Sequence, residues 1–123
     1  MAQNFLDGEC VLALDLETTG ISTNNDRIVQ IALIGSAEDG GQISYENLVN
    51  PRRSIPMQAS NVHGIYDSDV RSLGDFSTLA DEIYEQIEGA VIIGHNVRQF
   101  DLPLLNNEFR RLGRLPPNPK VVL

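Results

Sequence analysis

The chain has 123 residues, of which 41% are hydrophobic and 21% charged, and its formal net charge is −8. This length predicts one globular domain, residues 1–123, and excludes a second, while neither a membrane-spanning stretch nor a secretory leader is recognisable. The negative charge at first argues against a nucleic-acid partner, because Lys and Arg supply most of the affinity for phosphates. A lone cysteine, Cys10, excludes an internal disulfide, so we expect a cytoplasmic protein with no membrane partner.

The first half of the chain predicts strands, which we expect at residues 10–16, 27–35 and 42–49. The first is a continuous apolar run, typical of a strand buried on both faces. Asp39-Gly40-Gly41 predicts the hairpin turn between the second and third. Residues 63–70 are expected to form a loop.

The second half alternates helices with strands. Apolar residues recur at helical spacing from Phe76 to Ile87, with Asp75 or Ser77 opening this helix and Gly89 closing it. A buried strand follows at 91–93, then a helix that begins near Asp101, and a last strand at 120–123. Strands first, then alternating helix and strand, predict an α/β fold in which helices flank a mixed sheet.

Two carboxylates, Asp15 and Glu17, lie at the end of the first apolar run. Residues two apart in a strand point the same way, so these side chains share one face. Like charges this close repel unless a cation lies between them, and hard oxygen ligands suit Mg²⁺ or Mn²⁺. Asp101 follows the strand at 91–93, and if the two apolar strands are neighbours it approaches the same edge of the sheet.

Two simpler interpretations apply to these acids. Asp101 could be only a helix N-cap, a role compatible with metal binding. Asp15, Glu17 and Asp26, with Thr19 and Gly20, also fall at ligand positions of a calcium-binding EF-hand loop. A strand precedes this segment and no helix follows it, so we do not expect an EF-hand.

The ordered set of motifs Asp15-Leu16-Glu17-Thr18-Thr19-Gly20, Asn61-Val62-His63-Gly64-Ile65, Gly94-His95-Asn96 and Phe100-Asp101 resembles the DEDD (DnaQ-like, DEDDh) 3′-to-5′ exonucleases. This family includes the proofreading subunit of bacterial replicative polymerases. The resemblance covers almost the whole chain and implies a ribonuclease H-like fold. Each motif alone is weak, whereas the set in this order is specific.

The resemblance implies a role for each matching residue. Asp15 would bridge two metal ions, Glu17 would bind one of them, and Asp101 would act on the second, so these three would be both catalytic and metal-binding. The remaining matches, expected at the substrate, are Thr18, His63, Gly64, Ile65 and Asn96. For His63 a packing or loop role is an equally good interpretation, as is a loop cap for Asn96.

The sequence departs from the family pattern in two places. Val97-Arg98-Gln99 carries one extra residue before Phe100-Asp101, which bears on the register of Asp101. The family's third motif, a His followed five residues later by Asp, is absent, since neither His63 nor His95 is followed in this way. We therefore expect a C-terminally incomplete exonuclease domain, with activity at least about a thousandfold below a form that carries this motif.

Charge is uneven along the chain, which bears on partners. Residues 98–123 hold five basic and two acidic side chains, and Arg52 and Arg53 form another basic spot. We expect single-stranded or frayed 3′ ends of DNA as substrate, or RNA as the alternative, and a protein partner that delivers the domain to nucleic acid. The alternative from another class is a non-catalytic module of exonuclease fold that docks on a polymerase, a helicase or a nucleic-acid-integrating complex.

Overall fold

The computed structural model describes residues 6–123, and its sheet has five strands. The strands are β1 (Val11–Thr18), β2 (Ile28–Ser36), β3 (Gln42–Leu48), β4 (Val91–Ile93) and β5 (Val121–Val122). The α-helices are α1 (Met57–His63), α2 (Asp67–Val70), α3 (Ala80–Ile87) and α4 (Leu102–Arg111). A 3₁₀ turn, η1 (Phe76–Thr78), precedes α3, and a π-helical turn, η2 (Val97–Asp101), precedes α4.

The sheet is mixed, as predicted, with strand order β3-β2-β1-β4-β5. β1 pairs antiparallel with β2, which pairs antiparallel with β3, whereas β4 lies parallel to both β1 and β5. The two apolar strands β1 and β4 are therefore neighbours. A Cβ added to Gly35 would lie 1.8 Å from the Val11 carbonyl oxygen, so β1 and β2 pair this closely only because this residue is glycine.

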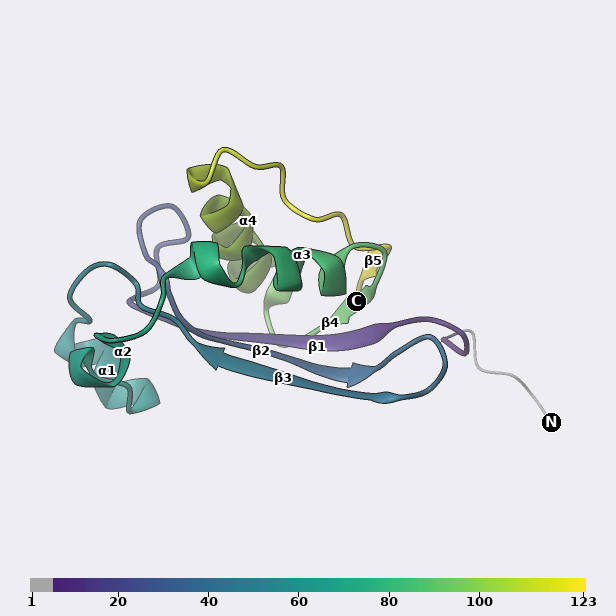
Figure 1. The fold of residues 1–123 in the computed structure, drawn as a ribbon, viewed down its shortest axis with the longest axis horizontal. Helices are drawn as coiled ribbons and strands as arrows, with labels where there is room; N and C mark the ends of the chain where they lie inside the picture. The colour runs from purple at the N-terminus through teal and green to yellow at the C-terminus, as the bar shows by residue number, and fades with distance from the viewer. Residues whose placement is uncertain (1–5) are drawn as a thin grey trace.

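Helices α3 and α4 cover one face of the sheet (Figure 1). The alternate β1 residues Leu12, Leu14 and Leu16 point into this core and are almost fully buried. The prediction that β1 is buried on both faces is wrong, because Asp15 on the opposite face is exposed. Within residues 6–123, no helix is long and apolar enough to cross a membrane.

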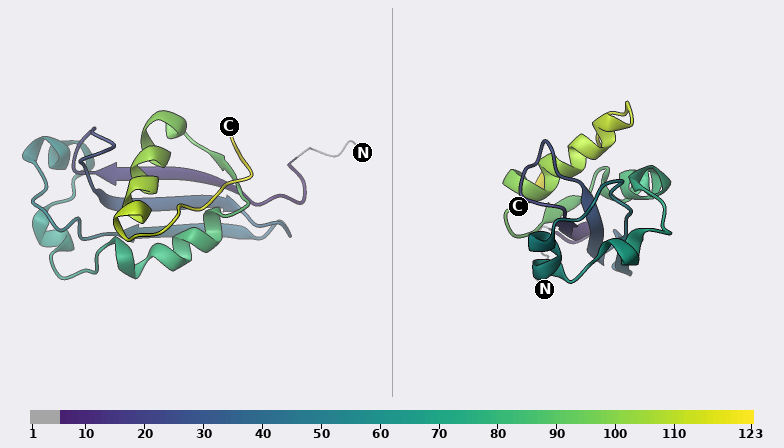
Figure 2. Two further views of the ribbon diagram at one scale, coloured as in Figure 1. Left: turned by 90° about the horizontal axis from the view of Figure 1, so that it is seen from above. Right: turned by 90° about the vertical axis from the view of Figure 1, so that its left-hand side faces the viewer.

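The prediction of a loop at 63–70 is wrong in part, because α1 ends at His63 and α2 occupies 67–70, so only residues 64–66 are a connection. α1 begins after Pro56 and ends at His63, where Gly64 takes a left-handed φ of 74° as C-cap. In α2, the Asp69 carboxylate accepts a hydrogen bond from the Tyr66 backbone N–H, which holds the first turn. α1, α2 and the loop at 19–27 lie at one end of the sheet, opposite the β2–β3 hairpin (Figures 1 and 2).

The helix expected from Phe76 onward is divided into η1 and α3. Asp75 caps η1 by accepting a hydrogen bond from the Ser77 backbone N–H at 3.1 Å, and Gly89, with a φ of 74°, follows the end of α3. The last strand is present but short, since β5 contains only Val121 and Val122.

Candidate active site

The end of β1 presents Asp15 and Glu17 on the sheet face that the leucines do not occupy. Asp15 is exposed and Glu17 is partly buried. The pairing with β2 shifts register between Glu17 and Thr18, where Val29 of β2 is left without a partner in β1, so the regular ladder is interrupted immediately after the two carboxylates. The predicted shared face of this acidic pair is confirmed.

Asp101 reaches β1 directly. Its Oδ2 accepts a hydrogen bond from the Leu16 backbone N–H at 3.0 Å, and Leu16 separates Asp15 from Glu17 in the sequence. The side chain makes no hydrogen bond that caps α4, so the simple N-cap interpretation of Asp101 is wrong. A third carboxylate thus lies at the acidic pair.

The π-helical turn η2 accommodates the extra residue before Asp101. The Leu102 backbone N–H donates to the Val97 carbonyl, five residues back, whereas an α-helix would use four. Asp101 therefore keeps its position against β1 despite the longer connection. π-helical turns of this kind are frequent at functional sites.

The three carboxylates repel one another. Burial, and then the charges of Asp15 and Glu17, raise the pKa of Asp101 to about 6, although the hydrogen bond from Leu16 opposes the shift. Burial, and then Asp15, raise the pKa of Glu17, and His63 acts in the opposite direction. A divalent cation would relieve this repulsion, and carboxylate oxygens are the ligands that Mg²⁺ and Mn²⁺ prefer, so the residues fit a metal.

In this structure the three carboxylates are not arranged as a complete metal site. Among residues 6–123, no group of three or more His, Cys, Asp or Glu side chains is arranged so that it could hold a metal ion. The metal-binding role of Asp15, Glu17 and Asp101 therefore stays a prediction.

A groove of about 230 Å³ opens beside Glu17. Its walls come from β1, the loop that follows it, α1 and η2, and they are formed by Leu16, Glu17, Thr18, Gly20, Ile21, Ala59, Val62, His63 and Phe100. Ile21 and Val62 are 91% and 85% exposed, which is unusual for apolar side chains. The sequence analysis gave no substrate role to Ile21, Val62 or Phe100; Ile21 and Val62 differ from core residues only by their exposure, and Phe100 is partly buried against the core.

Of the residues expected at the substrate, His63 and Thr18 line this groove. His63 Nδ1 accepts from the Ile65 backbone N–H at 3.1 Å, so Nε2 carries the proton and donates to the Thr18 carbonyl at 3.1 Å. The Thr18 hydroxyl donates to the Gly20 carbonyl at 2.7 Å. Both side chains thus hold the end of β1 against α1, and the packing interpretation of His63 has direct support.

The other expected substrate residues lie outside the groove. Ile65 is buried in a second apolar cluster with Val29, Ile55 and Val70, and Gly64 is the exposed C-cap of α1. Asn96 is exposed, takes a left-handed φ of 57°, and lines a separate cavity near Leu123. The structure gives Ile65 a packing role and places neither Gly64 nor Asn96 in the groove.

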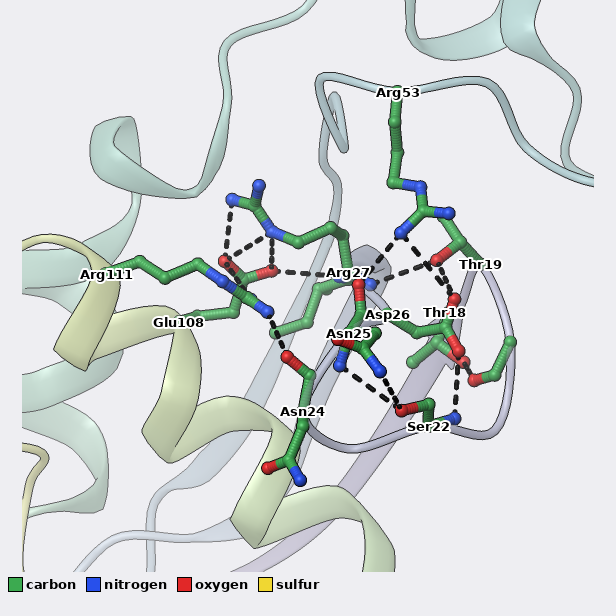
Figure 3. Close-up of polar contacts among 12 residues, drawn as sticks. Thr18, Thr19, Ser22, Asn24, Asn25, Asp26, Arg27, Arg53, Glu108 and Arg111 are labelled. Atoms are coloured by element: carbon green, nitrogen blue, oxygen red, sulfur yellow. Dashed lines mark hydrogen bonds and ion pairs between the residues drawn. The ribbon is translucent and has the colours of Figure 1, made fainter.

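The loop at 19–27 is held in place by its own side chains and by α4 (Figure 3). Asp26 accepts from the Ser22 backbone N–H and the Thr19 hydroxyl, each at 2.8 Å. On α4, the buried Glu108 accepts from Arg27 Nε at 3.0 Å and from the Ile28 backbone N–H at 3.0 Å. The Asp26 carboxylate is engaged within the loop and β2 follows, as expected for a segment that is not an EF-hand.

Residues 12–122 match the family model RNase_T, described as exonuclease. The chain belongs to this exonuclease family. It is 33% identical over 123 residues to a DNA polymerase III subunit epsilon-like protein of Rhodobacter capsulatus, covering 97% of this chain and 17% of that protein. It is 31% identical over 110 residues to DNA polymerase III subunit epsilon of Treponema pallidum, covering 89% of this chain and 51% of that protein. The DnaQ-like family assignment is confirmed.

Escherichia coli exonuclease I, solved in complex with a dA16 oligonucleotide, has the same fold. It superposes with a TM-score of 0.76 at 24% identity, covering 88% of this chain and 25% of that one. The ribonuclease H-like exonuclease fold predicted from the motifs is confirmed. The 3′-5′ exonuclease DinG of Bacillus subtilis is 32% identical over 114 residues, covering 90% of this chain and 12% of that protein. The exonuclease domain thus spans about half, or much less, of the length of these relatives.

The raised pKa of Asp101 predicts a pH dependence of stability in the absence of metal. Because the folded protein binds this proton more tightly than the unfolded chain, the contribution is fully present below about pH 4 and is lost as pH rises through about 6. Asp101→Asn keeps an oxygen acceptor for Leu16 but removes the charge. In thermal melts with EDTA between pH 4 and pH 7, the free energy of unfolding of the wild type should fall by up to about 3 kcal/mol more than that of Asp101→Asn. Parallel pH profiles for the two proteins would contradict this prediction.

Proposed function

We propose that this domain removes nucleotides one at a time from the 3′ end of single-stranded or frayed DNA. The observation that carries the proposal is the hydrogen bond from Leu16 to Asp101, which joins the carboxylate of the second motif to the acidic pair of the first. The family and its 3′-5′ exonuclease relatives support the reaction class. The exonuclease I structure with dA16 supports a single-stranded substrate.

In the proposed mechanism, Asp15, Glu17 and Asp101 hold two Mg²⁺ or Mn²⁺ ions. Such ions supply an activated water and stabilise the leaving 3′ oxygen when bound. The groove between the loop at 19–27 and α1 receives the terminal nucleotide, with exposed Ile21 and Val62 available to its base. Neutral His63, bonded to the Thr18 carbonyl, fixes the width of this groove.

Several finer features are part of the same proposal. The oligonucleotide in the exonuclease I structure is DNA, so we favour DNA and keep RNA ends as the alternative substrate. Two of the relatives are polymerase III epsilon or epsilon-like proteins, which supports delivery to nucleic acid by a protein partner. We further propose a cytoplasmic location.

The test compares two labelled oligonucleotides in Mn²⁺, one with a free 3′ end and one with a blocked 3′ end. We expect shortening of the first alone, with release of nucleoside 5′-monophosphates, and slower reaction at a duplex end, since the strand must unpair first. Shortening of the blocked strand from its free 5′ end would show the polarity to be wrong. Binding without any hydrolysis would favour the non-catalytic interaction module.

A further inference from the structure

A second cavity, of about 430 Å³, has three arginines among its seven lining residues. Its walls are the segment 50–54, which precedes α1, and residues of α2 and its C-terminal end. Arg52, Arg53 and Arg71 line it with a single acid, Asp67, so three positive charges face one negative charge. In a chain with a net charge of −8, three of the nine Lys and Arg residues gather at this cavity.

Arg53 connects this basic cavity to the candidate active site. Its Nη1 donates to the Asn25 carbonyl at 2.8 Å and lies 3.9 Å from Asp26 Oδ1 (Figure 3). Asn25 and Asp26 belong to the same loop that supplies Ile21 to the groove. A strand whose 3′ end occupies the groove can therefore extend across this loop to the basic cavity.

Arg52 and Arg53 are held in place by acids outside the cavity lining, since Arg52 Nε lies 3.3 Å from Asp75 Oδ2 and Arg53 Nη1 lies near Asp26, and their side chains stay partly exposed. Arg52 takes a left-handed φ of 58°, uncommon for a residue other than glycine, and its backbone N–H donates to Asn50 Oδ1 at 2.9 Å. The side chains of Arg52 and Arg53 remain 57% and 46% exposed. The Asp67 carboxylate is directed to the backbone, since its Oδ1 accepts from the Ile55 N–H at 2.9 Å.

Arg71 differs from every other basic residue of the chain. The other eight Lys and Arg side chains each make a hydrogen bond or ion pair. The Arg71 side chain makes neither a hydrogen bond nor an ion pair to residues 6–123, and the residue is exposed at the cavity wall. A planar guanidinium with free donors is suited to bidentate binding of a phosphate.

We propose that the basic cavity binds a backbone phosphate of the substrate strand, upstream of the nucleotide in the groove. This inference rests on the proposed exonuclease function, because it takes the occupant of the groove to be a 3′ end. An acidic protein repels the rest of the strand, and a local cluster of arginines offsets that repulsion where the strand leaves the groove. The cavity thereby favours longer single strands over dinucleotides.

The test measures binding to the full chain in an Asp15→Asn background, which separates affinity from cleavage. Fluorescence anisotropy with a labelled dodecathymidylate, and competition by unlabelled dinucleotide, compare Arg71→Gln with Arg110→Gln. Arg110 is an exposed arginine of α4 whose side chain donates a hydrogen bond to Asn107 and forms no ion pair with residues 6–123, so the charge change is matched. We expect Arg71→Gln to weaken dodecamer binding about tenfold and to reduce the salt slope by about 0.7, with dinucleotide binding unchanged. Arg110→Gln should leave both affinities unchanged.

Three results would overturn the proposal. Equal losses in Arg71→Gln and Arg110→Gln would show an effect of net charge alone. Equal losses for dodecamer and dinucleotide would place the lost contact in the groove. Suppose that millimolar inorganic phosphate displaces the dodecamer only when Arg71 is present, and that affinity does not depend on strand length. The cavity would then be assigned to free phosphate. Failure of the proposed function is distinguishable, because the chain with Asp15 intact would then show no hydrolysis while Arg71-dependent binding of the dodecamer remained.

Discussion

Asp15→Asn is expected to abolish both the response to Mn²⁺ and the hydrolysis of a 3′-labelled oligonucleotide. Asp15 raises the pKa of both Glu17 and Asp101, so its charge acts on each of the other two carboxylates. Removing this charge takes away one of the three proposed metal ligands. Stabilisation by bound metal is worth several kcal/mol, so the single-turnover rate should fall at least about 100-fold, or about 3 kcal/mol in activation free energy.

A matched control is Asp39→Asn, which makes the same charge change in the β2–β3 hairpin at the other end of the sheet. Asp39 Oδ1 accepts from the Gly41 backbone N–H, and asparagine can keep this bond. In melts with millimolar Mn²⁺, the wild type and Asp39→Asn should gain stability while Asp15→Asn gains none. A Mn²⁺-induced shift that survives Asp15→Asn would show that the metal binds elsewhere.

The meeting of the motifs could be predicted from the sequence because each lies next to a short apolar run. β1 and β4 are neighbours in the sheet, and this pairing brings Asp101 to Leu16 across 85 residues. The strand patterns and the glycine turn at 39–41 are local signals, so the first three strands and the hairpin could also be predicted from the sequence. The family motifs supplied the identity of the acids.

The parts that could not be predicted depend on contacts distant in the sequence. From the sequence alone, Glu108 is one polar residue of an amphipathic helix. Its partner Arg27 lies 81 residues away, so no local pattern indicates the pair. Asn96 and Ile65 belong to the matching motifs, yet only the packing shows that neither lines the groove. α1 and α2, of seven and four residues, are too short for a helical period to be recognised.

The groove was missed for a different reason. Ile21 and Val62 are apolar, and a sequence pattern assigns apolar residues to the core unless their surroundings are known. The structure exposes them on opposite walls, the loop after β1 and α1. The hydrogen bond of His63 to the Thr18 carbonyl joins the end of α1 to the end of β1, from which that loop leaves.

Glu108→Gln should destabilise the fold by about 3 kcal/mol, with a melting temperature lower by roughly 10 °C. Glu108 is only 1% exposed and faces Arg27, with Arg27 Nη2 2.8 Å from its Oε1. Glutamine still offers an oxygen to the Ile28 backbone N–H, but its amide group would face the guanidinium of Arg27, donor against donor. The loss of a buried charge pair therefore exceeds the loss of one hydrogen bond.

The matched control is Glu85→Gln, an exposed glutamate of α3, which should change stability by less than about 0.5 kcal/mol. Arg27→Gln should also destabilise the fold, because it leaves the buried Glu108 carboxylate with only the Ile28 N–H and Arg111, 3.6 Å away, among the described residues as partners. If Glu108→Gln melted within 1 °C of the wild type, the buried pair would not stabilise the fold.

Glu108 also bears on the candidate active site, because Asp101, the last residue of η2, and Glu108 of α4 each accept a backbone N–H group of a neighbouring strand. Asp101 binds Leu16 of β1, and two helical turns later Glu108 binds Ile28 of β2. Glu108→Gln should accordingly lower the melting temperature yet keep the Mn²⁺-induced shift, since the three proposed metal ligands remain. A variant that lost both would show that Glu108 holds Asp101 in place as well as stabilising the fold, and melts with and without Mn²⁺ distinguish the two outcomes.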